Sequence, residues 1–402
     1  MRYLLLNSLK SGGAERVAQT LSHTGLFEAI ILLEKDQDYK VDIPVFVISN
    51  HTWQTSAIWK TFFIPIYAWR VSRLVKKSDV VISFVERSNF VNIVASFIKH
   101  QKTVLTVHTN LEIAFKNKLK GLYFFLIKKL YPRATSIVSV SEGVSAQLKS
   151  LINYRGRMQV IYNPLELDKI NEASLVKLEK YWDFLDENQV IINVGRVSEP
   201  KGQWNLLRIF NGILKSNKNT KLLILGDGSH FNPLKIYAEK LGLRVFDGRE
   251  SGEPSGLYDV FLLGNQENPY KFYPRSTVFA LSSLYEGFSM VIIEAMACGL
   301  PAVSSDCNYG PREIISPRSS LSEKIIYPSY SDFGLLLPVP QGNMDSIEKQ
   351  AADDIWVETI SSFLANQEMR MAYAAASKKR AEFFSLEKIK DEWQSLFELI
   401  EK

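Results

Sequence analysis

Short apolar runs recur along the chain and are separated by longer stretches in which apolar positions follow a helical pattern. A short run with no polar side is typical of a strand that is buried on both faces. Strands that alternate with helices favour a parallel sheet with crossover helices. In the first part of the chain these predicted strands occupy residues 2–7, 29–33, 45–48, 80–84, 104–107 and 137–140.

The same alternation restarts after a Pro-containing turn at 163–165 and a charged segment at 166–188. A chain of 402 residues is too long for one ordinary domain and comfortable for two. We therefore predict domains at 1–163 and 164–384, followed by an amphipathic terminal helix at 385–402. Strands of the second domain are expected at 190–194, 222–225, 260–263, 302–304 and 334–338.

The composition describes a globular chain, with hydrophobic residues at 46% and charged residues at 23%. Its apolar runs are shorter than the roughly 18 residues of a membrane-spanning helix. The first residues lack the features of a signal peptide and are expected to form a buried strand. Cys298 and Cys307 are the two cysteines, so a disulfide framework is excluded and a cytoplasmic location is expected.

Glycine turns follow several of the predicted strands. Gly12 and Gly13 stand between the first strand and a helical pattern, an arrangement that leaves backbone N–H groups near the turn. The first strand of the second domain is followed by Gly195, with Arg196 and Lys201 close behind it. An arginine and a lysine five residues apart can place two cations on one diphosphate, although a solvated basic loop is the alternative.

The stretch 285–301 combines a glycine turn with a short apolar helix. Ser289 is the predicted N-cap, and Gly299 is the predicted C′ residue ahead of a proline. The first N–H groups of such a helix and its dipole suit a phosphate. Glu286 before the helix and Glu294 inside it can accept hydrogen bonds from hydroxyl groups. Taken alone, the stretch fits a capped amphipathic helix equally well.

The spacing of Glu286 and Glu294, with Gly-Phe after the first and Ala-Met-Ala-Cys-Gly-Leu-Pro after the second, resembles the signature of the family 4 retaining glycosyltransferases. The glycine turns at 12–13, 195–202, 226–228 and 264 are similar to further segments of that family. The resemblance implies the GT-B fold, an α/β architecture of two Rossmann-like domains facing a central cleft. It implies that domain 1–163 binds the acceptor, that domain 164–384 binds the nucleotide sugar, and that the terminal helix at 385–402 crosses back to the first domain. The Gly-Pro-Arg-Glu-Ile-Ile segment at 310–315 resembles the subgroup that transfers N-acetylhexosamines during bacterial surface-glycan assembly.

The resemblance implies a transferase that uses a nucleotide sugar, expected to be UDP-linked, and a glycan or lipid-linked acceptor. No cofactor and no metal are expected, because cationic side chains and helix amides would stabilise the departing diphosphate. The residues expected to act in catalysis are Glu286, His108, Arg196 and Lys201. The residues expected to bind the donor are Gly12, Gly13, Gly195, Arg196, Lys201, Gly264, Glu286, Gly287, Phe288, Ser289, Met290 and Glu294.

Positive charge is concentrated in the first 163 residues, which hold 22 Lys and Arg against 10 Asp and Glu, whereas the remainder holds 26 against 33. Two stretches, 58–77 and 115–133, interleave aromatic residues with cations, which fits contact with anionic headgroups. The alternative is that the aromatics are core residues and the cations ordinary surface residues. Nucleic acid is disfavoured because no recognition motif accompanies the charge. We expect the protein to bind peripherally to the inner face of the cell membrane. The residues expected to make this contact are Trp69, Arg70, Arg73, Lys76, Lys77, Lys128 and Lys129.

Two other functions are compatible with the sequence. A nucleotide-sugar epimerase of GT-B fold would also need a phosphate site, but it would need acid and base groups at the sugar ring and no acceptor surface. A catalytically silent GT-B binding subunit would keep the fold and lose the set of Arg196, Lys201 and Glu294, which this chain retains.

Overall fold

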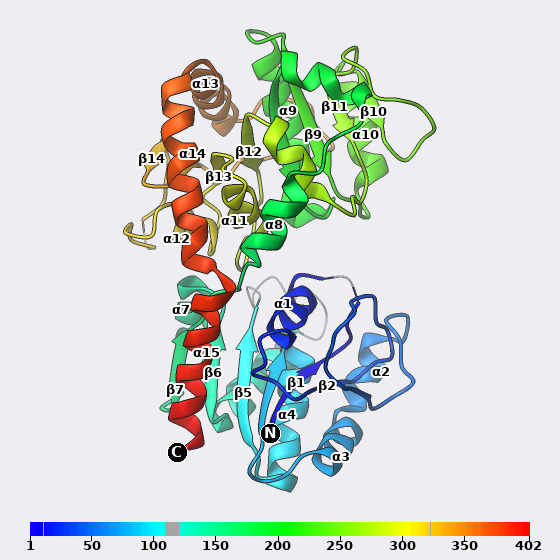
Figure 1. The fold of residues 1–402 in the computed structure, drawn as a ribbon, viewed down its shortest axis with the longest axis vertical. Coiled ribbons are helices and arrows are strands. Elements are labelled where there is room, and N and C mark those ends of the chain that lie inside the picture. The colour runs from blue at the N-terminus through cyan, green and yellow to red at the C-terminus, as the bar shows by residue number, and fades with distance from the viewer. Residues whose placement is uncertain (11, 109–119, 322) are drawn as a thin grey trace. The chain divides into compact units, whose positions relative to one another are not determined.

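The computed structural model describes residues 1–10, 12–108, 120–321 and 323–402. It divides into two compact units (Figure 1), unit 1 comprising Met1–Leu165 with Phe384–Lys402 and unit 2 comprising Glu166–Phe383. The boundaries expected from the sequence, after residues 163 and 384, differ from these by one or two positions.

Unit 1 is built on a parallel sheet of seven strands in the order β3-β2-β1-β4-β5-β6-β7. This order contains the 3-2-1-4-5-6 arrangement of a Rossmann fold. The central strands are apolar runs with both faces covered, and the predicted strands at 2–7, 29–33, 45–48, 80–84, 104–107 and 137–140 are confirmed to within two residues. The strands are β1 (Arg2–Leu6), β2 (Ala29–Leu32), β3 (Val45–Val47), β4 (Val80–Phe84), β5 (Lys102–Val107), β6 (Ser136–Ser139) and β7 (Arg157–Val160).

Helices connect these strands, and the helix at the C-terminal end of the chain also packs on unit 1. The connecting helices are α1 (Gly13–Ser22), α2 (Ala57–Phe62), α3 (Ile64–Leu74), α4 (Glu86–Lys99), α6 (Lys120–Leu130) and α7 (Glu142–Leu151). The terminal helix α15 (Leu386–Glu401) buries Ile389, Trp393 and Phe397 in the same hydrophobic cluster as residues of β1 and β2. The amphipathic pattern at 385–402 is thus explained by an apolar face that covers the sheet of unit 1.

Unit 2 is built on an eight-stranded sheet in the order β10-β11-β9-β8-β12-β13-β15-β14. Neighbouring strands are parallel except for β14 and β15, which are antiparallel. The strands are β8 (Gln189–Val194), β9 (Thr220–Leu225), β10 (Val245–Asp247), β11 (Val260–Leu262), β12 (Val278–Leu281), β13 (Ala302–Ser305), β14 (Ser329–Ser331) and β15 (Gly334–Leu337).

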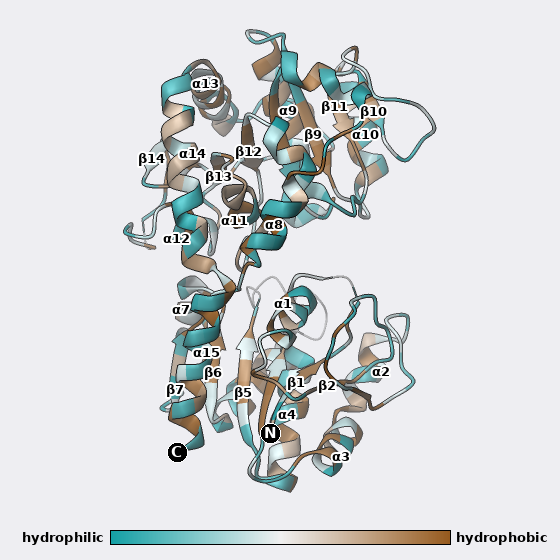
Figure 2. Cartoon of the chain, in the orientation of Figure 1, coloured by the Kyte–Doolittle hydropathy of each residue, from teal (hydrophilic) through white to brown (hydrophobic). Residues whose placement is uncertain are grey.

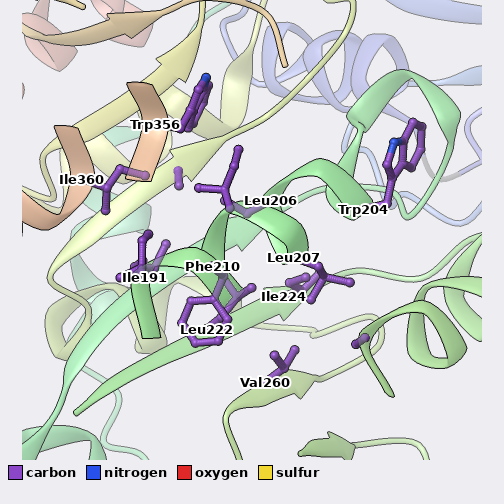
Figure 3. Packing of buried hydrophobic residues seen from close by; sticks show 14 of the residues in the cluster. Ile191, Trp204, Leu206, Leu207, Phe210, Leu222, Ile224, Val260, Trp356 and Ile360 are labelled. Carbon is purple, nitrogen blue, oxygen red and sulfur yellow. The ribbon is translucent and has the colours of Figure 1, made fainter. Parts of the chain in front are cut away.

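The helices of unit 2 cover this sheet and complete its core. They are α8 (Leu167–Ser174), α9 (Gln203–Leu214), α10 (Phe231–Lys240), α11 (Met290–Ala297), α12 (Pro311–Ile315), α13 (Ala351–Ala365) and α14 (Gln367–Ala381). Figure 3 shows side chains of β8, β9, β11 and α9 packed together, with Trp356 and Ile360 of α13 added from another part of the chain. In Figure 2 the strands are largely brown while the helices carry teal residues as well, as expected for helices with one buried face.

Two strands of unit 2, β10 and β14, were not identified from the sequence. Both are short strands at the edges of the sheet. Three-residue strands such as these give too little periodicity to be recognised in advance.

Candidate functional site

Three glycine turns meet at the carboxyl ends of β8, β9 and β11, the edge where open parallel sheets bind ligands. Gly195, Gly226 and Gly264 have φ angles of 152°, 134° and 65°, a region that favours glycine. The Gly195 N–H donates to the Leu225 carbonyl at 2.9 Å, and the Gly226 N–H donates to the Gly264 carbonyl at 2.7 Å. Backbone hydrogen bonds therefore join these glycine turns into one layer, and the side-chain stems of Lys201 and Arg249 lie beside it.

Lys201 and Glu286 meet at this edge, although 85 positions separate them in the sequence. The Lys201 Nζ donates to Glu286 Oε1 at 2.6 Å, and the Ser283 Oγ donates to the same oxygen at 2.6 Å. The two loops are also joined through their backbones, because the Leu284 N–H donates to the Pro200 carbonyl at 2.8 Å. The structure thus places a largely buried carboxylate against a partly exposed ammonium group.

Arg196 stands beside this ion pair on the turn that follows β8. Its side chain is exposed and has no hydrogen-bond or ion-pair partner among the described residues. Its backbone is fixed, because the Gln203 Nε2 donates to the Arg196 carbonyl at 3.0 Å. The two cations predicted to bind a diphosphate therefore belong to one short loop, 195–202. Lys201 is already paired with Glu286, whereas Arg196 is available to a ligand.

The N-terminus of α11 lies at the end of the loop that follows β12. Ser289 occupies the N-cap position as predicted, but the expected side-chain cap is wrong, because its hydroxyl makes no capping hydrogen bond. The Ser289 Oγ lies on a residue that is 2% exposed and has no hydrogen-bond partner among the described residues. A buried hydroxyl without a partner is costly, so this atom is suited to a bound polar group.

The opposite end of α11 confirms the predicted role of Gly299. This residue has a φ of 75° and follows the C-cap residue Cys298. Its N–H donates to the Met296 carbonyl at 2.9 Å, while the Leu300 N–H donates to the Ala295 carbonyl at 3.0 Å. This is a Schellman motif, which satisfies the last carbonyls of the helix and fixes its length.

Glu294 and the charged residues of the Gly-Pro-Arg-Glu-Ile-Ile segment, Arg312 and Glu313, are buried. Glu294 lies inside α11 and is 3% exposed. Arg312, from the Gly-Pro-Arg-Glu-Ile-Ile segment, forms a two-pronged ion pair with Asp306, with Nε donating to Oδ1 at 2.8 Å. Arg312 therefore fastens α12 to the loop after β13. Burial raises the pKa of the Cys298 thiol to about 12 and that of Cys307 further, so neither is a thiolate at neutral pH.

Arg249 was missed by the sequence analysis, although it lies beside the glycine turns. Its guanidinium lies 3.4 Å from the centroid of the Phe231 ring, and its Nη2 donates to Asn232 Oδ1 at 2.5 Å. Its Nη1 lies 3.7 Å from an Asp227 oxygen, and its side-chain stem flanks Gly264. No local motif surrounds Arg249 in the sequence, so only the fold brings it to this edge.

His108 and the two first glycines belong to unit 1 and not to unit 2. The His108 Nε2 lies 2.9 Å from the Thr106 Oγ1, and its ring stacks on Phe84 with centroids 5.0 Å apart. Burial lowers the pKa of His108 to about 3, so the imidazole is neutral at physiological pH and can exchange a hydrogen bond with a hydroxyl group. Gly12 precedes α1 and Gly13 begins it, as predicted from the strand-turn-helix pattern.

A buried ion cluster lies near the carboxyl ends of β2 and β4 and corrects part of the basic-aromatic interpretation. Lys60 is 5% exposed, and its Nζ donates to Glu34 at 2.9 Å, while Arg87 donates to the same carboxylate. Lys60 is therefore not a surface cation. Tyr67, from the same predicted stretch, is also fully buried. Val85, which precedes Arg87, has a φ of 63°, a strained conformation for a β-branched residue.

The tryptophan and the six cations that were expected at a surface lie there. The exposed residues are Trp69, Arg70, Arg73, Lys76, Lys77, Lys128 and Lys129. Residues 115–119 of the second basic-aromatic stretch lie outside the described residues, and within its described part Tyr131 belongs to the core. In the described parts of the chain, no cluster of three or more His, Cys, Asp or Glu side chains is arranged to hold a metal ion. No helix among the described residues has the length and apolarity needed to cross a bilayer.

Two family descriptions match the two halves of this chain. The family described as "Glycosyltransferase Family 4" matches residues 11–169, and "Glycosyl transferases group 1" matches residues 178–332. An uncharacterized glycosyltransferase of Methanocaldococcus jannaschii is 30% identical over 379 residues, which cover 89% of each chain.

A second relative is an N-acetylgalactosamine-N,N'-diacetylbacillosaminyl-diphospho-undecaprenol 4-alpha-N-acetylgalactosaminyltransferase of Campylobacter jejuni. It is 27% identical over 397 residues, which cover 96% of each chain. Among solved structures, Anabaena HepE in complex with UDP is similar with a TM-score of 0.70 at 17% identity, covering 99% of each chain. Sucrose-phosphate synthase from Thermosynechococcus elongatus has a TM-score of 0.74 at 16% identity, covering 99% of this chain and 98% of the other. These likenesses show the fold of the chain, two Rossmann-like domains of the GT-B class.

Proposed function

The chain belongs to the family 4 glycosyltransferases, and from this premise we propose that it moves a sugar, with retention of configuration, from a UDP-linked donor to a lipid-linked or polysaccharide acceptor. The observation that carries the proposal is the group of unsatisfied donors at the carboxyl edge of unit 2. Arg196 is exposed without a partner, and the buried Ser289 hydroxyl lacks one among the described residues. Both suit the oxygens of a diphosphate.

In this proposal the diphosphate of the donor is bound by Arg196, Lys201, Ser289 and the first amides of α11. The negative charge on the diphosphate grows as the bond to the sugar breaks, so these fixed donors stabilise the transition state more than the ground state. The glycine layer at Gly195 and Gly226 lets the nucleotide approach the backbone. Glu286 holds Lys201 in place and can accept a hydrogen bond from a sugar hydroxyl, and Glu294 has the chemistry to accept one from the ribose.

Support for the substrates comes from the relatives. HepE was crystallised with UDP, and the Campylobacter jejuni relative is named for an acceptor on diphospho-undecaprenol and for the transfer of N-acetylgalactosamine. We propose the same classes here: a UDP-linked donor, with an N-acetylhexosamine as the first sugar to test, and a lipid-linked acceptor. The neutral His108 in unit 1 is assigned to hydroxyl contacts with the sugars.

The proposal is tested by incubating the purified protein with a panel of nucleotide sugars and measuring release of the free nucleotide and the identity of the sugar product. We expect slow hydrolysis of one UDP-sugar, accelerated by a lipid-linked glycan acceptor. Appearance of an epimerised nucleotide sugar would instead identify an epimerase. Nucleotide binding without turnover on any donor and acceptor would identify a binding subunit.

We further propose that the reaction needs no divalent metal. The negative charge of the diphosphate is compensated by Arg196, Lys201 and the N-terminus of α11. Activity in excess EDTA should therefore equal the activity measured without EDTA. The measurement is the rate of UDP release before and after chelation. Loss of activity that Mn²⁺ or Mg²⁺ restores would contradict this part of the mechanism.

We also propose that unit 1 attaches the enzyme to the cytoplasmic face of a membrane through the exposed cations of α3 and the segment that follows it. Each such cation contributes about 1 kcal/mol near an anionic surface, an effect that salt screens. The protein should therefore sediment with liposomes that contain anionic lipid, and less so as the salt concentration rises. Joint replacement of Arg70, Arg73, Lys76 and Lys77 by glutamine should abolish most of this sedimentation.

A matched control removes four exposed lysines of unit 2 by the same substitution, Lys177, Lys215, Lys218 and Lys240. It lowers the net charge equally, so it should sediment with anionic liposomes nearly as well as the unmodified protein. Equal sedimentation with neutral vesicles, or none with either kind, would reject the membrane proposal.

A further inference from the structure

A groove of about 500 Å³ runs between β3 and α3 in unit 1. β3 ends the sheet at this side among the described residues, so its outer edge has no neighbouring strand. The groove has apolar walls and two arginines. Its lining residues are Val45, Phe46, Val47, Ile48, Trp69, Arg70, Arg73 and Leu74. Its volume is that of a site for a small molecule.

The apolar walls are exposed to an unusual degree. Phe46 is 43% exposed, Trp69 is 55% exposed and Leu74 is 38% exposed. Further exposed apolar side chains lie on α2 and the start of α3, outside the groove lining: Ile58, Trp59, Phe62 and Ile66. A local gathering of exposed apolar side chains, rimmed by polar ones, marks a surface that another molecule covers.

The charged side chains at the groove are all positive. Arg70 donates from Nη1 to the Ile48 carbonyl, which fixes its guanidinium at the groove. Arg73, Lys76 and Lys77 are exposed and have no carboxylate partner among the described residues. Apolar walls beside guanidinium groups that have no carboxylate partner among the described residues are complementary to a molecule that joins a hydrocarbon chain to a phosphate.

We propose that this groove binds one acyl chain of an anionic phospholipid, with the phosphate on Arg73 and the remaining N–H groups of Arg70. The inference rests on the proposed membrane contact and goes beyond it, because general attraction to a charged surface needs no groove. An acyl chain buried between Phe46, Trp69 and Leu74 would add apolar burial to an attraction that salt screens, so the contact would depend less on salt.

The topology favours a membrane phospholipid over the lipid of the acceptor. α3 is a crossover helix that leads into β4, so its last turn, with Arg73 and Leu74, points toward the amino edge of the parallel sheet. The carboxyl edge, where His108 lies, is the edge at which such sheets bind their substrates. A phosphate on Arg73 therefore lies away from the edge to which an acceptor must bring its sugar.

The test uses short-chain lipids below their micellar concentration, so that no membrane surface is present. Dioctanoyl phosphatidylglycerol should bind, as measured by calorimetry and by the fluorescence of tryptophan. Dioctanoyl phosphatidylcholine should bind at least tenfold more weakly, and glycerol phosphate, which has no chain, should not bind measurably. Phe46→Ser with Leu74→Ser should weaken binding of the anionic lipid at least tenfold and leave UDP binding unchanged.

A matched control replaces two exposed apolar residues outside the groove lining, Ile58→Ser with Phe62→Ser, and should keep the binding of the short-chain lipid. The groove site would be overturned if the groove variant bound the anionic short-chain lipid as tightly as the unmodified protein, or if the control variant lost as much affinity as the groove variant. It would also be overturned if glycerol phosphate bound as tightly as the lipid. Displacement of the short-chain lipid by a polyprenyl phosphate at equal or lower concentration would assign the groove to the acceptor lipid and also overturn the proposal. If liposome sedimentation persists while monomeric lipid fails to bind, the groove fails and the membrane contact stands.

Discussion

Lys201→Ala should weaken the binding of UDP by roughly 10- to 150-fold, because a hydrogen bond to a charged group is worth about 1.5–3 kcal/mol. The substitution removes an ammonium group from the diphosphate site and leaves Glu286, whose side chain is largely buried, without its cation. The uncompensated carboxylate then repels the diphosphate, so the loss should fall toward the upper end of the range. Arg196→Ala should reduce the free energy of UDP binding by about the contribution of one charge-assisted hydrogen bond. Isothermal titration calorimetry with UDP measures both effects.

Lys215→Ala is the matched control for both variants. Lys215 is exposed and follows α9, whose 12 residues place it roughly 18 Å from Lys201 at the other end of that helix. It removes the same charge from the same unit and should leave the affinity for UDP within about twofold of the unmodified protein. Unchanged affinity in both the Lys201 and the Arg196 variants, or equal loss in the control, would reject the assigned site. Thermal melting of each variant separates loss of binding from loss of folding.

Gly226→Ala should destabilise unit 2 by roughly 2–4 kcal/mol and abolish UDP binding at concentrations that saturate the unmodified protein. A Cβ at this position would lie 2.1 Å from the Gly195 carbonyl oxygen, which is a backbone atom and cannot rotate away. Relief of this contact requires the turns after β8 and β9 to separate, and that movement displaces Arg196 and Lys201 with them. Chemical denaturation followed by tryptophan fluorescence measures the change in stability, and calorimetry measures the binding.

The control for this prediction is Gly252→Ala. Gly252 has a φ of 146°, close to the 134° of Gly226, but a Cβ there would meet no atom within 4 Å among the described residues. Both substitutions carry a similar backbone strain, and only the first carries the clash. Gly252→Ala should therefore cost less than Gly226→Ala and should retain UDP binding. Equal destabilisation would show that the backbone angle, and not the contact between turns, makes glycine necessary at Gly226.

The parts of the fold that could be predicted are those that a local sequence signal marks repeatedly along the chain. The central strands are apolar runs, and the short turns between strands and helices carry glycine, so the two Rossmann-like domains could be inferred from the sequence. Gly299 was predicted as a helix end because a glycine followed by Leu-Pro is a local signal, and the hydrogen bonds of its Schellman motif agree. Arg196 and Lys201 lie on one loop, so their proximity to a strand end could also be predicted.

The errors arise where contacts between distant segments decide the outcome. Lys60 resembles a surface cation in its local sequence, but Glu34 lies 26 positions earlier and pairs with it in the interior. Ser289 stands at a helix start, yet its hydroxyl does not cap the helix. Arg249 reaches the glycine turns from the loop after β10, a strand too short to be recognised. Buried ion pairs and hydroxyls without partners depend on the fold and are not visible in a sequence pattern.

The ion cluster of Glu34, Lys60 and Arg87 also shows how unit 1 is constrained near its carboxyl edge. Two cations share one carboxylate in the interior, so removal of the carboxylate would leave both without compensation. The strained Val85 lies next to this cluster, between β4 and α4. Strain of this kind persists where the surrounding contacts fix the backbone, and here it coincides with the edge of the sheet at which His108 also lies.

The most direct test of the donor site is a crystal structure of the protein with UDP. The account predicts the diphosphate at the carboxyl edge of unit 2, with phosphate oxygens within hydrogen-bond distance of the Ser289 Oγ, the Lys201 Nζ and the guanidinium of Arg196. The Lys201 ammonium should either leave Glu286 or bridge it to the phosphate. UDP bound elsewhere, or a diphosphate that touches none of these three groups while Lys201 remains on Glu286, would contradict the account.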